Sequence, residues 1–313
     1  MTRAFVFPGQ GSQAVGMGRE LAEAFPVARE LFQEVDDALS QKLSRLMAEG
    51  PEDELTLTEN AQPALMAVSL AVVRVLEREG GVDLAQAARF VAGHSLGEYS
   101  ALAAAGTFSV ADAARLLKIR GRAMQKAVPV GLGAMAALIG IELDAAREIA
   151  AAAAEGEVCE AANDNGGAQV VVSGHKGAVE RAMKIAAERG VKRAVPLPVS
   201  APFHCALMQP AAEAMAEALA TVTMHAPKVP VVANVTAAPV TDPAEIRDLL
   251  VRQVTGTVRW RECVLTMRDA GVATLVELGA GKVLSGLARR IDKSLSGSAV
   301  GTPAEVEAFL AGL

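Results

Sequence analysis

The order of hydrophobic and polar positions predicts strands that alternate with helices along much of the chain. An apolar run at Arg3–Gly9 reads as a buried strand, and a second run at Arg89–Gly93 reads as another. Helical patterns are predicted over Arg19–Leu39, Glu59–Gly81, Leu96–Gly106 and Ser109–Val128. Strands that are separated by helices usually pair in parallel, with helices covering the sheet. The first part of the chain therefore predicts a covered parallel sheet.

The pattern changes between residues 131 and 199, where it reads strand–helix–strand–strand–helix–strand. The two central strands, Glu157–Asp164 and Ala168–Gly174, meet across Asn163–Gly167, a sequence typical of a hairpin. This order is that of a ferredoxin-like unit. Helices and strands alternate again after Pro202. We therefore predict an α/β fold with a discontinuous large domain (residues 1–129 and 200–313) and an inserted ferredoxin-like (βαββαβ) small domain (residues 130–199).

Composition narrows the class of protein. The chain has 313 residues, of which 51% are apolar and 21% charged, as in globular proteins. A net charge of −6 and only 3% aromatic residues argue against a nucleic-acid partner. No stretch approaches the roughly 18 apolar residues of a membrane helix, and the N-terminal apolar run is too short for a secretory signal. Three widely spaced cysteines fit a reducing compartment, so we expect a cytoplasmic protein without a membrane partner.

A Gly-x-Ser-x-Gly sequence lies between the strand predicted at Arg89–Gly93 and the helix that follows. Gly93, Ser95 and Gly97 occupy its fixed positions. Between a strand and a helix this motif is a nucleophile elbow, which exposes the serine Oγ at the carboxyl edge of a hydrolase-like sheet. The backbone N–H of Leu96 then lies at a helix N-terminus, where it can stabilise an oxyanion. The alternative is that the glycines only form a tight turn.

Of the four histidines, His204 is the candidate base for Ser95. It lies in a loop directly after the predicted small domain, where the chain returns to the large domain. His94 precedes the serine, but neighbouring side chains diverge on such a turn, so we expect it to have a structural role. Cys205 could be read as another nucleophile, although we expect a buried structural thiol. The other two histidines are expected at a helix start and in a polar loop.

One arginine of the helix predicted over Ser109–Val128 falls on its apolar side. At about 100° per residue, Arg120 shares a face with Leu116, Leu117 and Met124. The opposite, solvated face is predicted to carry Arg115, Lys118 and Arg122. A buried guanidinium needs an anionic partner, and its fork fits a carboxylate. That partner is either an internal Asp or Glu or the carboxylate of a substrate.

Seven short motifs together resemble one enzyme family. They are "FVFPGQGSQ", "GHSLGEYSAL", "RG..MQ", "GAMAA", "AQVVVSG", "FHCALM" and "VRQ", in this order along nearly the whole chain. The set resembles the malonyl-CoA:acyl carrier protein transacylases of fatty-acid synthesis and the related acyltransferase domains of polyketide synthases. The free-standing length favours fatty-acid synthesis.

The resemblance implies catalytic roles for residues at the matching positions. Ser95 would be the nucleophile that is acylated, and His204 would be its base, without an acidic third member. A backbone carbonyl near Gln253 would orient the imidazole. The backbone N–H groups of Gln10 and Leu96 would form the oxyanion hole.

The resemblance also implies how the acyl group is bound. Arg120 would bind the free carboxylate of the malonyl group, and Met124 and Phe203 would line the same site. Phe203 matches the malonyl form of this segment, because a serine at this place is associated with methylmalonyl selection in polyketide domains.

The partners implied are malonyl-CoA and acyl carrier protein, with coenzyme A entering as the substrate thioester and no cofactor. A monomer suffices for this chemistry. Carrier proteins are acidic, so the basic cluster Lys184, Arg189, Lys192 and Arg193 is a candidate docking surface or else a solvated charged face. Two other functions stay open: a serine hydrolase or thioesterase with the same elbow, and a non-catalytic module that binds carrier protein.

Overall fold

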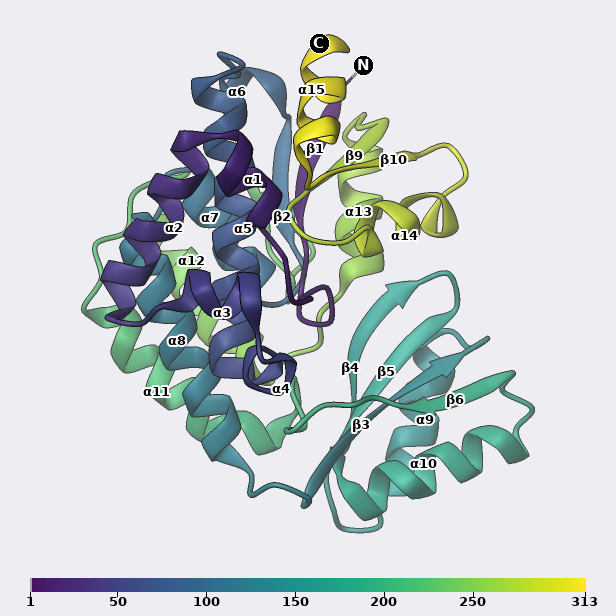
Figure 1. The fold of residues 1–313 in the computed structure, drawn as a ribbon. Helices are drawn as coiled ribbons and strands as arrows, with labels where there is room; N and C mark the ends of the chain where they lie inside the picture. The colour runs from purple at the N-terminus through teal and green to yellow at the C-terminus, as the bar shows by residue number, and fades with distance from the viewer. Residues whose placement is uncertain (1) are drawn as a thin grey trace.

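The computed structural model describes residues 2–313, whose strands form two separate β-sheets (Figure 1). In the larger sheet every neighbouring pair of strands is parallel except β7 and β8. In spatial order its strands are β10 (Ser296–Val300), β9 (Thr274–Leu278), β1 (Arg3–Phe7), β2 (Phe90–Gly93), β7 (Val231–Val232) and β8 (Pro239–Val240). This is the mostly parallel sheet that the sequence predicted.

Side chains of β1 supply apolar surface to both faces of the larger sheet. Phe5 and Phe7 belong to the larger core, whereas Ala4 and Val6 belong to a second core on the opposite face. The helices that contribute to the larger core are α1 (Arg19–Ala24), α2 (Pro26–Leu39), α3 (Leu43–Glu49), α4 (Glu52–Thr56), α5 (Thr58–Arg78), α6 (Leu84–Ala87), α7 (Gly97–Ala104), α8 (Val110–Ala127), α11 (Gln209–Ala220), α12 (Pro243–Thr255) and α15 (Pro303–Ala311). The second core lies under α13 (Trp260–Asp269) and α14 (Val283–Ile291).

The smaller sheet is antiparallel and has the strand order β4-β5-β3-β6. It consists of β3 (Gly133–Ile139), β4 (Cys159–Gly166), β5 (Gln169–His175) and β6 (Arg193–Pro196), with α9 (Leu143–Ala154) and α10 (Lys176–Glu188) packed on one face. Along β3, Ala136 and Leu138 pack under these helices, whereas Met135 and Ala137 join the larger core. The other face of the small sheet therefore lies against the large part of the molecule. The fold class is as predicted, and the division at residues 129/130 and 199/200 stays a prediction.

Several predicted elements differ in extent from the observed ones. The helix predicted over Arg19–Leu39 is divided, because Pro26 begins a new helix at its first position. Strand β7 has only two residues, Val231–Val232. Helix α13 was not predicted, although it buries Trp260 and Cys263. No helix within residues 2–313 is long and apolar enough to cross a membrane.

Candidate active site

The turn from β2 into α7 has the backbone geometry of a nucleophile elbow. Ser95 adopts φ 54°, in the left-handed region that non-glycine residues rarely occupy. A Cβ atom on Gly93 would lie 1.8 Å from the carbonyl oxygen of Gly97, and one on Gly97 would lie 2.3 Å from the carbonyl oxygen of Phe7. Only glycine fits at either place. The turn therefore depends on both glycines of the motif and holds Ser95 at the carboxyl end of β2.

The structure brings His204, in the loop after β6, to Ser95 at the carboxyl end of β2. The Ser95 Oγ lies 2.7 Å from His204 Nε2, and His204 Nδ1 lies 2.9 Å from the carbonyl oxygen of Gln253. Because a carbonyl oxygen can only accept, Nδ1 carries the proton and Nε2 presents its lone pair to the serine hydroxyl. Burial, together with the charge of Arg120, lowers the pKa of His204 to about 3. The imidazole is therefore neutral and able to accept a proton at neutral pH.

Two side-chain amides hold the backbone of the elbow. Asn234 accepts a hydrogen bond from the Ser95 N–H at 2.8 Å and donates one to the Gly93 carbonyl at 2.7 Å. Gln253 Nε2 donates to the Ser95 carbonyl at 2.9 Å. Sequence analysis missed Asn234, although it follows β7 at the carboxyl edge of the sheet, where ligand-binding residues gather in α/β folds. These bonds stabilise the unusual backbone conformation of the serine.

Arg120 lies inside the site and is 1% exposed. Its Nη1 donates to Gln62 Oε1 at 2.8 Å, and its Nη2 donates to Gln253 Oε1 at 2.8 Å and to Ser95 Oγ at 3.2 Å. Among residues 2–313, no Asp or Glu lies within ion-pair distance of this guanidinium. The structural ion pair that the sequence left open is therefore not formed, and the guanidinium is held by neutral amides. Gln62, which sequence analysis missed, carries no local signal in the buried helix α5.

A cavity of about 550 Å³ opens onto Ser95 and His204. Its wall includes the other residues that the resemblance implied, Gln10, Leu96, Arg120, Met124 and Phe203, and also Gln62, Met135 and Asn163. Within the described chain, neither the Gln10 N–H nor the Leu96 N–H donates a hydrogen bond to another residue. Leu96 directly precedes α7, so its N–H lies at the positive end of a helix. Both N–H groups are thus without a protein acceptor among residues 2–313.

His94 and Cys205 have surroundings that suit structural roles. His94 Nε2 lies 2.8 Å from Asn165 Oδ1, and its ring packs beside Trp260 with centroids 5.8 Å apart. The Cys205 thiol donates to the Pro202 carbonyl at 3.2 Å, and burial raises its pKa to about 11. A thiol of that pKa remains protonated at neutral pH and is a poor nucleophile.

The predicted solvated face of α8 is wrong at Lys118. This side chain is buried, and its Nζ donates to Asn60 Oδ1 at 2.8 Å and to Gln41 Oε1 at 2.9 Å and lies 3.0 Å from a Glu59 carboxylate oxygen. Helical periodicity could not show that α5 and the loop after α2 would cover this position. Arg122, by contrast, is 65% exposed and pairs with Glu59 at 2.7 Å.

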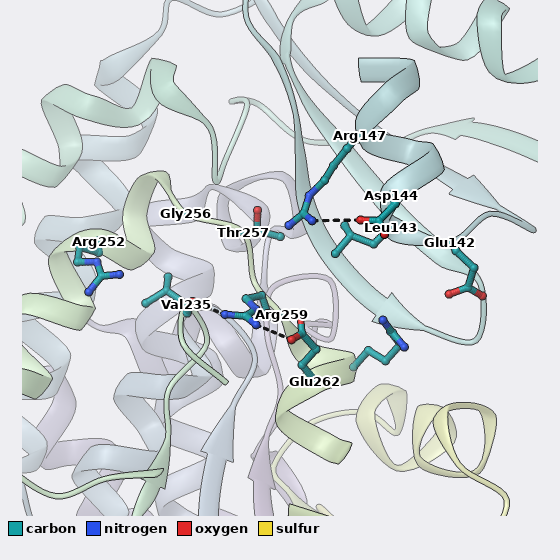
Figure 2. Close-up of a pocket in the computed structure, with 11 residues that line it drawn as sticks. Glu142, Leu143, Asp144, Arg147, Val235, Arg252, Gly256, Thr257, Arg259 and Glu262 are labelled. Atoms are coloured by element: carbon teal, nitrogen blue, oxygen red, sulfur yellow. Dashed lines mark hydrogen bonds and ion pairs between the residues drawn. The ribbon is translucent and has the colours of Figure 1, made fainter. Parts of the chain in front are cut away.

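A larger cavity, of about 720 Å³, is lined by residues of α9, α12 and α13 and of the loops beside them (Figure 2). Two pairs of its charged groups bind each other: Arg147 lies 3.4 Å from Asp144, and Arg259 donates to Glu262 at 2.8 Å. None of its eleven lining residues is a serine, a cysteine or a histidine. The smaller cavity, where a serine hydroxyl lies beside a neutral imidazole and a buried guanidinium, is therefore the candidate active site.

Comparisons with known proteins show the family of the chain. Residues 4–301 match the model of the acyl transferase domain family. The chain is 49% identical to the malonyl CoA-acyl carrier protein transacylase of Escherichia coli (strain K12) over 98% of each chain, and 46% identical to that of Bacillus subtilis (strain 168) over 97% of this chain and 95% of the relative.

Two solved structures extend this similarity to the fold. The acyl-carrier-protein S-malonyltransferase of Bartonella henselae has a TM-score of 0.97 and 60% identity over 100% of this chain and 99% of the other. A chain in the complex of a type II PKS acyl-carrier protein with its malonyl-transacylase has a TM-score of 0.96 and 44% identity, over 100% of this chain and 100% of that chain. Both similarities cover the whole chain and therefore both of its sheets.

Proposed function

Because the chain belongs to the acyl transferase family, we propose that it transfers the malonyl group from malonyl-CoA to the phosphopantetheine thiol of acyl carrier protein. Malonyl-CoA and acyl carrier protein are the partners that the names of its relatives carry. The observation on which the assignment of residues rests is the position of Ser95 Oγ. It lies 2.7 Å from the base His204 and 3.2 Å from the cation Arg120. The Ser95 Oγ is thus close both to the proton acceptor, His204, and to the cation that would bind the malonyl carboxylate, Arg120.

The first half-reaction makes a malonyl ester of Ser95. His204 Nε2 takes the hydroxyl proton while Oγ attacks the thioester carbonyl carbon. The negative charge that develops on the carbonyl oxygen is stabilised by the N–H groups of Gln10 and Leu96, and removal of one such donor costs roughly 3 kcal/mol in comparable sites. When the tetrahedral intermediate collapses, the carbon–sulfur bond breaks, and His204 returns the proton to the departing coenzyme A sulfur.

The second half-reaction reverses these steps with another thiol. The phosphopantetheine sulfur loses its proton to His204 and attacks the malonyl ester, and Ser95 Oγ leaves with that proton. Arg120 binds the free carboxylate in both half-reactions, so the reacting carbonyl is held beside Oγ as well as recognised. In both half-reactions the proton is transferred only between His204 and the reacting oxygen or sulfur atom. These steps use no cofactor.

Single-turnover kinetics of the isolated malonyl-enzyme test transfer against hydrolysis. We expect the ester to persist in buffer and to decay rapidly when holo acyl carrier protein is added, with malonyl appearing on the carrier. Equally fast decay in buffer alone would assign the protein to the serine hydrolases, which use the same elbow. Apo carrier protein, which lacks the phosphopantetheine thiol, is the control.

Two further features belong to this proposal. The basic cluster is exposed where it could meet an acidic carrier protein: Lys184 lies on α10, Arg189 and Lys192 lie in the turn after it, and Arg193 begins β6. The three cysteines are free and buried, which accords with a reducing cytoplasm.

A further inference from the structure

Glu98, in the first turn of α7, is a buried carboxylate beneath the catalytic serine. It is 2% exposed, and its Oε2 accepts hydrogen bonds from Gln253 Nε2 at 2.7 Å and from the Asn234 N–H at 3.2 Å. Gln253 and Asn234 are the two residues that hold the backbone of Ser95. The Glu98 carboxylate thus binds both of the residues, Gln253 and Asn234, that hold the nucleophile elbow.

The same carboxylate decides how the Gln253 amide is oriented. An ionised carboxylate only accepts hydrogen bonds, so it requires the NH₂ group of Gln253 on its side. The amide oxygen of Gln253 then faces the other way, where it accepts from Arg120 Nη2 at 2.8 Å. The anion and the cation are therefore joined through a single amide and do not touch.

We propose that Glu98 is a positioning residue that balances the charge of Arg120 through the Gln253 side chain and leaves the guanidinium free of any carboxylate until the acyl group arrives. This inference rests on the proposed function, in which Arg120 binds the malonyl carboxylate. A buried cation without a compensating charge is unfavourable, whereas a direct ion pair would occupy the fork that the substrate needs. A carboxylate placed one amide away meets both requirements.

A bound malonyl group places a second carboxylate near the same cation. The two anions repel each other, so malonyl binding and protonation of Glu98 favour one another by the same factor. Burial raises the pKa of Glu98 to about 7. Malonyl binding is therefore expected to weaken as the pH rises through neutrality.

The other ionisable groups around Glu98 keep one charge state in this range. They are Arg120 on α8, Tyr99 on α7 and Cys263 on α13. The histidines that line the cavity are His94 and His204. Burial raises the pKa of Tyr99 and of Cys263 above their usual values and lowers the pKa of His94. The pKa of His204 is about 3, and arginine stays charged. A change near neutral pH in the binding of malonyl-CoA that acetyl-CoA does not show is therefore assigned to the titration of Glu98.

Equilibrium binding to a Ser95→Ala protein measures this coupling without acyl transfer. The quantity is the Kd of acetyl-CoA divided by the Kd of malonyl-CoA, because this ratio isolates the carboxylate and cancels the contribution of coenzyme A. It is determined by calorimetry near pH 6 and near pH 8 for Ser95→Ala alone and combined with Glu98→Gln, Glu277→Gln or Arg120→Ala. Glu277 is a matched control, since it is fully buried but caps α14, accepting from the Ser285 N–H at 2.8 Å.

In the Ser95→Ala protein the ratio should fall by about threefold or more between pH 6 and pH 8, because the lower limit of coupling between linked sites, about fivefold, is only partly expressed over this pH range. When Glu98→Gln is added, the ratio should keep its pH 6 value at both pH values. When Glu277→Gln is added instead, the ratio should fall with pH as it does in the Ser95→Ala protein. A ratio that is independent of pH in the parent protein, or one that Glu98→Gln lowers at both pH values, overturns the inference. If Glu98→Gln does not fold, the pH dependence of the parent decides.

The Arg120→Ala combination separates this inference from the proposed function. It should bring the ratio close to one at both pH values. A ratio that Arg120→Ala leaves unchanged would contradict the receptor role of Arg120 itself. A ratio that depends on Arg120 but not on Glu98 would contradict only the role of Glu98.

Discussion

Replacement of Arg120 by alanine should separate malonyl transfer from the transfer of uncharged acyl groups. The guanidinium is 1% exposed and lies 3.2 Å from Ser95 Oγ, so a bound carboxylate would meet it in a site largely closed to water. Loss of one member of a buried, hydrogen-bonded charge pair costs about 2–5 kcal/mol. At 1.4 kcal/mol for each factor of ten, the middle of this range corresponds to a loss of roughly 10²- to 10³-fold in kcat/KM for malonyl-CoA.

Acetyl-CoA lacks the carboxylate, so its kcat/KM should change by less than about tenfold in the same variant. The assay is transfer to holo carrier protein, followed by mass spectrometry of the carrier with each donor. Arg122→Ala is the matched control on the same helix, because that side chain is 65% exposed and bonds only Glu59; it should leave both donors within about twofold. Equal losses for malonyl-CoA and acetyl-CoA in folded Arg120→Ala would refute the receptor role.

Of four further predictions, two concern the base, one the elbow and one the docking surface. Because the pKa of His204 is about 3, the rate constant for acylation of Ser95 at saturating malonyl-CoA should be constant between about pH 5 and 8 in rapid-quench experiments. An inflection in this rate constant at the ordinary histidine pKa near 6.5 would contradict this. The unfolded chain protonates His204 at that ordinary pKa, so the associated stability is present above about pH 6.5 and is lost as the pH falls towards 3; His204→Gln should flatten this part of the unfolding profile measured by denaturant. Gly97→Ala places a Cβ 2.3 Å from the Phe7 carbonyl oxygen and should destabilise the protein by about 2 kcal/mol or more, whereas a thermal midpoint like that of the parent would show that the elbow tolerates a side chain. Lys192→Glu combined with Arg193→Glu should raise the KM for carrier protein severalfold without slowing acylation by malonyl-CoA, and an unchanged KM would remove this surface from the docking site.

The sequence predicted most of the architecture because its signals are local. Apolar runs such as Arg3–Gly9 and turn residues such as those at Asn163–Gly167 act within a few positions, and they identified both sheets. The elements that were missed or misjudged depend on distant contacts. Lys118 is buried because Glu59 and Asn60 of α5 cover it, and periodicity within α8 contains no information about α5.

The candidate site divides in the same way. Ser95 lies in a recognisable motif, and Arg120 is conspicuous as a cation on an apolar helical face. Glu98 lies in the first turn of a helix, where an acidic residue is also favoured by the helix dipole alone, so its burial could not be read from the sequence. Asn234 joins the site only because β7 pairs with β2. Such partners become visible when the sheet order is known.

The measurement that tests the account most directly is peptide mapping by mass spectrometry after incubation with malonyl-CoA. We predict one malonyl group on the peptide that contains Ser95, none in Ser95→Ala, and loss of the group when holo carrier protein is added. A malonyl group on another residue, or transfer to the carrier by Ser95→Ala at the rate of the parent protein, would contradict the account.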